Sequence, residues 1–257
     1  MVYLFSALKI KIPLMDNIKI FLSGLSMGLT PGKLGEILKS YILKKKYNID
    51  FSLTASTVFI ERLTGIIGCF ILCLIAIIIL NKGTVYSYIF FLLIVMVLCF
   101  FIIVFKSPKF FCYMLSKISN VKILAKKIDI FKNFYKGMLN LLNIKVFFIC
   151  TGISVLYWSM ECILFYNILK IFYVDIDIIN CIFLLTSISI IGGLSFMPGS
   201  LGALEGGLIT VLIYKGISFD LASVITILHR FFAMWLFIII GASVLILNIG
   251  YFKLYKR

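Results

Sequence analysis

The chain has 257 residues and a formal net charge of +15, and 63% of its residues are hydrophobic while only 14% are charged. A soluble domain carries about 25% charged residues, so this composition excludes a soluble fold. The apolar runs are continuous rather than alternating, which excludes a membrane β-barrel. The sequence therefore predicts an all-α, polytopic integral membrane protein.

Six apolar stretches are candidates for membrane segments, since about 20 helical residues cross the hydrocarbon core. The first and the fifth are interrupted by a Pro-Gly pair, at Pro31-Gly32 and Pro198-Gly199. These pairs predict two broken or re-entrant helices, and ordinary kinked spanning helices are the alternative. We expect six to eight membrane segments in one transmembrane domain, residues 1–257. The six stretches are 18–41, 53–80, 85–105, 146–169, 178–214 and 221–247.

A basic connector, residues 106–145, lies between the two halves of the chain. It mixes lysines with aromatic residues, which is typical of an amphipathic helix at the membrane interface. Nineteen of the 25 basic residues fall in the N-terminal segment, residues 39–46, the connector and the tail, whereas the opposite loops hold only Lys82, Lys170 and Lys215. The positive-inside rule therefore predicts a multi-pass protein of the cell membrane with a cytoplasmic C-terminus. The positive charge favours anionic lipid, and not nucleic acid, as the partner.

The two halves of the chain share three short blocks in the same order, which predicts an internal duplication. Repeat 1 covers about 18–80 and repeat 2 about 178–248. The matching blocks are 31–35 (PGKLG) with 198–202 (PGSLG), 49–53 (IDFSL) with 217–221 (ISFDL), and 60–62 (IER) with 228–230 (LHR).

The two repeats are predicted to cross the membrane in opposite directions. After the first Pro-Gly block the chain runs to the lysines at 44–46, and after the second it runs to the lysine-poor loop at 215–220. This is an inverted-topology repeat, in which broken helices meet near the bilayer midplane and build a substrate site.

Two arginines occupy equivalent positions in the repeats, Arg62 and Arg230. Each lies ten or eleven residues into its predicted helix, about 15–17 Å deep at 1.5 Å per residue. A charge at the midplane costs at least about 2.5–3.5 kcal/mol. Since a guanidinium group can donate two parallel hydrogen bonds to phosphate, we predict that the arginines face each other and bind a phosphate.

Carboxylates accompany both breaks. Glu36 and Glu205 each fall early in the helix that follows a Pro-Gly pair, where the helix N-terminus favours a negative charge. We expect each to pair with an arginine of the other repeat, and Glu61 is included in the site as the neighbour of Arg62. The alternative is structural pairing of these glutamates with Arg62 or Arg230, without a substrate.

Other polar residues give no enzyme signature. With one histidine, His229, and no clustered thiols, the sequence predicts no metal and no cofactor. Residues 202–207 (GALEGG) lack the Lys-Ser/Thr of a phosphate-binding loop. Glu161 is interpreted as satisfying a neighbouring helix, and His229 as a packing or hydrogen-bonding residue. A transporter is therefore favoured over an enzyme.

Residues 30–65 and 197–231 resemble the flippase-like membrane family that is named after the transmembrane region of lysylphosphatidylglycerol synthase. The hallmarks of that family are a PG-x-x-GE block, a later ERL, and a second PG-x-x-G-x-x-E block followed by an arginine-bearing helix. They match Pro31, Gly32, Gly35 and Glu36, then residues 61–63, then Pro198, Gly199, Gly202 and Glu205, then Arg230.

The resemblance implies a protein that moves anionic or sugar-bearing lipids between leaflets, with a glycosyltransferase or envelope-synthesis partner. Two departures stand out: no synthase domain follows Arg257, so lipid aminoacylation is not carried over, and only about 29 residues precede the first block. We expect translocation of an anionic or glycosylated phospholipid or a polyprenyl-phosphate lipid. The alternatives are a membrane-embedded subunit of a lipid-linked glycosyl- or aminoacyl-transferase system, with Glu36 or Glu205 as a base, and a scaffold that transports nothing.

Overall fold

The computed structural model describes residues 2–8, 10–28, 35–80, 92, 96, 128–194 and 198–253. This part of the chain is helical and contains no strand, so the all-α prediction is confirmed. Three stretches in it are long and apolar enough to cross a membrane, Phe51–Ile79, Ile144–Ile171 and Phe219–Leu247. They match three of the predicted spans, while the span at 85–105 lies outside the described residues.

Repeat 1 begins with two short helices that pack against each other, α2 (Leu14–Leu25) and α3 (Gly35–Tyr47). They have 12 and 13 residues, too few to cross about 30 Å of hydrocarbon. Pro31 and Gly32 lie between them, outside the described residues. The long helix α4 (Phe51–Ile79) follows directly and packs against α3.

The described end of the connector forms α8 (Ile128–Leu141), which is amphipathic as predicted. Its buried face, Tyr135, Met138 and Leu141, packs on Ile60 of α4 and on Leu4 of α1 (Val2–Ala7). Its opposite face is exposed and carries lysines. α8 therefore packs against both α1 and the N-terminal half of α4.

Repeat 2 is described almost throughout. α10 (Ile178–Leu194) is followed by a short turn η2 (Pro198–Ser200) and by α11 (Ala203–Tyr214), which packs back on α10. The second Pro-Gly pair therefore makes a helical hairpin rather than a kink in one spanning helix. Gly199 and Gly202 have φ values of 59° and 82°, which glycine adopts without steric cost.

A continuous helical stretch completes repeat 2. It consists of α12 (Phe219–Arg230), a π-helical turn η3 (Phe231–Trp235) and α13 (Leu236–Leu247), and α14 (Ile249–Lys253) follows. Ser218 caps its start, since its hydroxyl accepts a hydrogen bond from the backbone of Leu221.

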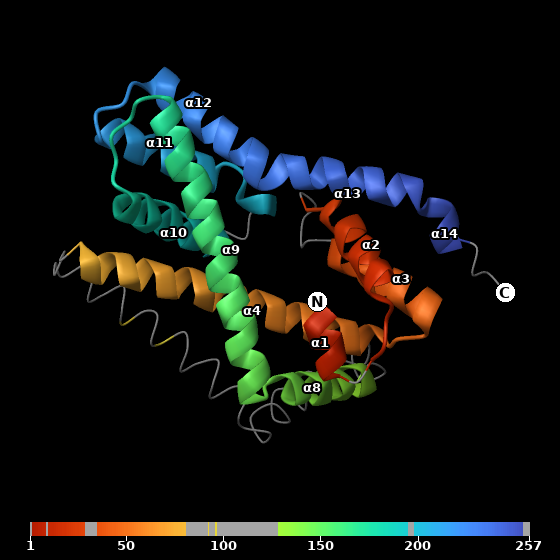
Figure 1. Ribbon diagram of the computed structural model, residues 1–257. Helices are drawn as coiled ribbons and strands as arrows, with labels where there is room; N and C mark the ends of the chain where they lie inside the picture. Colours follow the sequence, from red (N-terminus) through yellow and green to blue (C-terminus); the bar gives the residue numbers. More distant parts are fainter. Residues whose placement is uncertain are drawn as a thin grey trace.

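The first helix of each repeat packs against the long helical stretch of the other repeat. α10 of repeat 2 packs on α4 of repeat 1, and α2 of repeat 1 packs on α13 of repeat 2. Sγ of Cys73 lies 3.6 Å from Oγ of Ser187 at the first contact, and a Cβ on Gly241 would lie 2.5 Å from the carbonyl oxygen of Leu22 at the second. Figure 1 shows α4 and the α12–α13 stretch running in opposite directions. Reciprocal packing of this kind is what an inverted repeat related by a twofold axis produces.

The helix α9 (Ile144–Ile171) crosses both long helices and joins the two repeats (Figure 1). The largest core lies where it meets the second hairpin, around Phe165, Leu185, Leu208 and Ile225. Because lipid tails are as apolar as these side chains, close packing rather than exclusion from water holds such helices together. This core fixes the position of the second Pro-Gly turn.

Candidate functional site

Arg230 and Glu205 join the end of α12 to the second Pro-Gly turn. Nε of Arg230 donates to Oε1 of Glu205 at 2.6 Å, and a terminal nitrogen of Arg230 donates to the carbonyl oxygen of Gly199 at 2.6 Å. The backbone N–H of Gly202 donates to Oε2 of Glu205 at 2.7 Å. We call these four residues the Arg230 clasp, because one guanidinium and one carboxylate hold the whole turn.

The local sequence explains this geometry. The positive φ of Gly199 and Gly202 folds the turn tightly, and α11 then starts at Ala203. Glu205 is therefore in the first turn of α11, where the helix N-terminus stabilises its negative charge as predicted.

Arg230 is the last residue of α12 before the π-helical turn η3. Such turns inside α-helices are frequent at functional sites. Arg230 is 8% exposed, and the side chain of Glu205 is 24% exposed. Removing one partner of a buried ion pair leaves an uncompensated charge, which costs about 3–5 kcal/mol.

The clasp forms within repeat 2. Glu205 pairs with the arginine of its own repeat, so the expectation that it pairs with an arginine of the other repeat is wrong for this pair. The hairpin brings residues 199–205 back against the end of α12, and this proximity could not be read from the spacing of the motifs.

The first copy of the motif is only partly described. Pro31 and Gly32 lie outside the described residues, while Gly35 starts α3 and Glu36 follows it in the first turn. Arg62 is exposed on α4, beside the half-buried Glu61. That the two arginines form one site stays a prediction.

α9 connects the helices that carry the two arginines. The indole N–H of Trp158 donates to the carbonyl oxygen of Gly65 on α4 at 2.9 Å. One turn further, a Cβ on Gly68 would lie 2.8 Å from Cβ of Ser154, so the helices touch where Gly68 allows it. At its other end, Phe165 packs edge to face on His229 of α12, with the ring centroids 5.3 Å apart. The sequence analysis did not predict that α9 joins the two long helices. Gly65 and Gly68, two small residues one turn apart on α4, were the available sign of a close helix contact.

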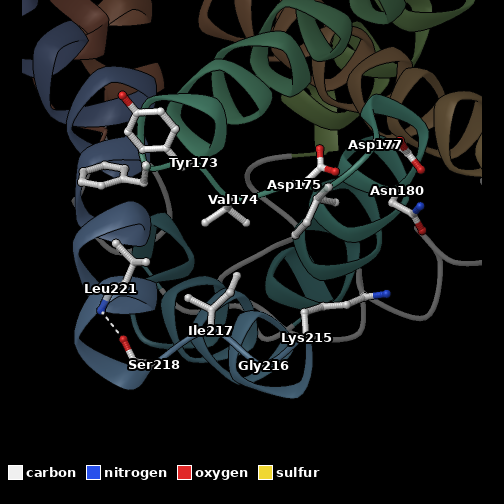
Figure 2. Close-up of a pocket in the computed structure, with 12 residues that line it drawn as sticks. Tyr173, Val174, Asp175, Asp177, Asn180, Lys215, Gly216, Ile217, Ser218 and Leu221 are labelled. Atoms are coloured by element: carbon white, nitrogen blue, oxygen red, sulfur yellow. Dashed lines mark hydrogen bonds between the residues drawn. The ribbon is translucent and has the colours of Figure 1, made fainter.

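An open pocket of about 440 Å³ lies between the turn after α9 and the turn between α11 and α12 (Figure 2). Asp175, Asp177, Asn180 and Lys215 line it together with apolar residues. Lys170 donates to Asp175 at 2.7 Å at its edge. These turns are the lysine-poor loops of the sequence analysis.

At the lysine-rich end, Asp16 of α2 accepts hydrogen bonds from Lys46 at 2.6 Å, from Tyr251 at 2.8 Å and from Tyr47. The ammonium group of Lys46 also lies 3.6 Å from the ring centroid of Tyr251. Burial opposes ionisation of Asp16, but the hydrogen bonds outweigh it and lower the pKa of Asp16, while Asp16 raises the pKa of Lys46 against the same opposition. We call these residues the Asp16 cluster, and it ties α2 and α3 to α14.

Metal binding has no support in the described residues. No group of three or more His, Cys, Asp or Glu side chains there is arranged to hold a metal ion. The described cysteines are free and buried, and such cysteines act as small apolar residues.

Paired hairpins, long apolar helices and a buried ion pair at a helix break define a polytopic α-helical membrane protein. Residues 1–241 match the model of the family described as the lysylphosphatidylglycerol synthase TM region, and the chain belongs to that family. It is 30% identical over 222 residues to a UPF0104 membrane protein of Methanocaldococcus jannaschii. The aligned region covers 83% of this chain and 90% of the relative.

A UPF0104 membrane protein of Methanothermobacter thermautotrophicus is 29% identical over 113 residues, 44% of this chain and 33% of the relative. A further match in that organism is 28% identical over 103 residues, 40% of this chain and 30% of the relative. No solved structure matches the chain.

Proposed function

We propose that the protein translocates phosphate-bearing lipids between the leaflets of the cell membrane, with an anionic or glycosylated phospholipid or a polyprenyl-phosphate lipid as substrate. The observation that carries the proposal is the Arg230 clasp. A guanidinium group that is held at a helix break by a carboxylate can exchange that carboxylate for a phosphate of the same charge and similar geometry.

The position of Arg230 along α12 supports a site on the path of a lipid headgroup across the membrane. It is the twelfth residue of α12, so it lies about 16–18 Å from the start of that helix at 1.5 Å per residue. An ionisable residue at this depth is costly and is expected to serve a polar substrate or a structural partner. The phosphate of a crossing lipid needs such a compensating charge at the same depth.

The hairpin offers a mechanical consequence of phosphate binding. When a phosphate replaces Glu205 on Arg230, the ion pair that ties the first turn of α11 to α12 is released, and the α10–α11 hairpin becomes freer to move against α4. In repeat 1, Arg62 and Glu36 would act in the equivalent way on the α2–α3 hairpin. Alternate movement of the two hairpins would expose the site to one leaflet and then to the other.

Family membership supports a lipid-related function, because the family is described by a lipid-modifying enzyme. The proposed topology has a cytoplasmic C-terminus, which its lysine-rich surroundings support. A glycosyltransferase or another envelope-synthesis protein that supplies or consumes the lipid is the partner we propose.

The transferase alternative has less support. Glu205 pairs with Arg230 and accepts a hydrogen bond from the backbone of Gly202, which supports the role of a counter-ion.

The test is lipid transport by the purified chain in vesicles that contain a fluorescent phosphatidylglycerol, with a membrane-impermeant quencher reporting the outer leaflet. We expect the wild-type chain to expose all of the fluorescent lipid to the quencher. Arg230→Ala is expected to slow exposure at least about tenfold, because a phosphate then crosses without its counter-charge, and Arg62→Ala plus Arg230→Ala is expected to abolish it.

Lys170→Ala is the matched control, because it removes a positive charge from an exposed surface pair. It should leave the exposure rate unchanged. If the double arginine variant moves lipid at the wild-type rate, the proposed site is wrong.

A further inference from the structure

Polar atoms of three side chains on α9 and α12 are buried and lack hydrogen-bond partners within the described part of the chain. They are Oε2 of Glu161, Oγ1 of Thr226 and both ring nitrogens of His229. Thr226 and His229 are completely buried. Since each buried polar group without a partner costs about 1–3 kcal/mol, three of them call for a physical explanation.

Glu161 lies between the two contacts that fix α9. It comes three residues after Trp158, which is bound to α4, and four residues before Phe165, which packs on His229 of α12. Residues at these spacings share one side of a helix. His229 directly precedes Arg230 in α12. Glu161 therefore lies one helical turn from the residue that contacts the neighbour of Arg230, and it is not one of the residues of the Arg230 clasp.

Arg230 also keeps a free donor. Its two hydrogen bonds use Nε and one terminal nitrogen, and the other terminal nitrogen makes none within the described residues. Thr226 lies one helical turn before Arg230, so its hydroxyl group is on the same side of α12. Free donors and a free carboxylate oxygen thus occur together beside one buried charge.

We propose that Glu161, with Thr226 and His229, is a headgroup subsite that selects phosphate lipids whose headgroup carries a hydroxyl or ammonium donor next to the phosphate. The phosphate would bind Arg230 and Thr226, and the donor would bind Oε2 of Glu161. This inference rests on the proposed function, since it assigns a phosphate to Arg230.

The physical reason is the cost of an unpaired buried acceptor. A phosphodiester without a donor would leave Oε2 of Glu161 unpaired beside a second negative charge. Sites built to bind a substrate hydroxyl or amine discriminate strongly, up to about 10⁴-fold or more, against an analogue that lacks it. The edge-to-face contact with Phe165 explains the packing of the His229 ring but leaves its nitrogen atoms unaccounted for.

The test compares two lipids of equal charge, phosphatidylglycerol, which has headgroup hydroxyls, and phosphatidylmethanol, which has none. Binding of each to the purified full chain is measured in detergent by native mass spectrometry. We expect the wild-type chain to prefer phosphatidylglycerol by at least about tenfold. Glu161→Gln should bind both lipids about equally, and Glu161→Asp should restore part of the preference.

Ser159→Ala is the matched control on α9, because its hydroxyl bonds only to the carbonyl oxygen of Val155 within its own helix. It should keep the wild-type preference. Thr226→Val is the second variant and should weaken binding of both lipids equally, since it removes a donor to the phosphate. If Glu161→Gln is not monodisperse, binding of the two lipids to Thr226→Val is the deciding measurement. Binding as strong as that of the wild-type chain would contradict the subsite.

No preference in the wild-type chain, or a full preference in Glu161→Gln, would also overturn the inference. The vesicle assay keeps the two proposals apart. A chain that shows the preference but moves no lipid refutes the translocator and leaves the subsite standing. A chain that moves both lipids at equal rates and binds them equally refutes the subsite alone.

Discussion

Nε of Arg230 lies 2.6 Å from Oε1 of Glu205, and the same guanidinium group donates to the carbonyl oxygen of Gly199. One side chain at the end of α12 therefore holds both the first turn of α11 and the Pro-Gly turn that precedes it. Any event that removes the carboxylate from Arg230 also releases the first turn of α11 from α12. The charge of Arg230 and the position of the α10–α11 hairpin are therefore coupled.

Glu205→Gln should destabilise the lipid-free protein by about 3–5 kcal/mol, because it leaves the buried charge of Arg230 without its counter-ion. An anionic lipid should then restore more stability to this variant than to the wild-type chain. Thermal unfolding in detergent, with and without phosphatidylglycerol, measures both effects. An equal rise in Tm for the two proteins would contradict the exchange of carboxylate for phosphate.

Gly241→Ala should destabilise the contact between α2 and α13 by about 1–3 kcal/mol, since its Cβ would meet the backbone of Leu22 at 2.5 Å. Gly152→Ala on α9 is the matched control, because a Cβ there meets nothing within 4 Å. It should be neutral or stabilising by up to about 1 kcal/mol. If both variants unfold at the wild-type temperature, the close contact between α2 and α13 is contradicted.

Asp16→Asn should destabilise the protein by about 1.5–3 kcal/mol near neutral pH, because it weakens hydrogen bonds to a charged group. The pKa of Asp16 is lowered by folding, so its contribution is present above the unfolded value of about 3.9 and is lost as the pH falls through the lower folded value. The pKa of Lys46 is raised by folding, so its contribution is present below the ordinary value of 10.5 and is lost as the pH rises through the higher folded value.

The stability difference between the wild-type chain and Asp16→Asn should therefore be constant from about pH 5 to about pH 9 and should shrink at both extremes. Urea unfolding at several pH values, or thermal unfolding where urea is ineffective, gives this difference. A difference that changes steadily between pH 5 and pH 9 would show that the Asp16 cluster is not the cause.

Trp158→Phe should destabilise the contact between α4 and α9 by about 0.5–1.5 kcal/mol, because the hydrogen bond to the carbonyl oxygen of Gly65 is lost while the aromatic ring is kept. Thermal unfolding measures the change. Trp235→Phe is the comparison, since Trp235 is 40% exposed on η3. A larger loss of stability in Trp235→Phe than in Trp158→Phe would contradict the role given to α9.

The hydrophobic pattern and the second Pro-Gly pair were enough to predict long helices, the broken segment at Pro198-Gly199 and the amphipathic end of the connector. They also placed Glu205 in the first turn of the helix after the break. These features are local, because a helix of about 20 apolar residues and a glycine at positive φ depend on residues close in sequence.

The contacts that depend on chain folding could not be predicted in this way. Asp16 and Tyr251 are 235 residues apart and meet only because α2 packs beside the end of α13. Glu205 pairs with Arg230 because the hairpin returns to α12, and no spacing in the motif encodes that return. The exposure of Arg62 depends on which helices leave α4 uncovered, which is a property of the whole bundle.

The account is tested most directly by a variant that removes both charges of the ion pair, Arg230→Met with Glu205→Gln. Replacing a buried ion pair with neutral groups is often neutral or stabilising, so this chain should stay folded, with a Tm close to that of the wild-type protein. If Arg230 serves a lipid phosphate, the variant should fail to expose fluorescent phosphatidylglycerol in vesicles. Exposure at the wild-type rate would show that the ion pair is structural and would contradict the proposed translocation site.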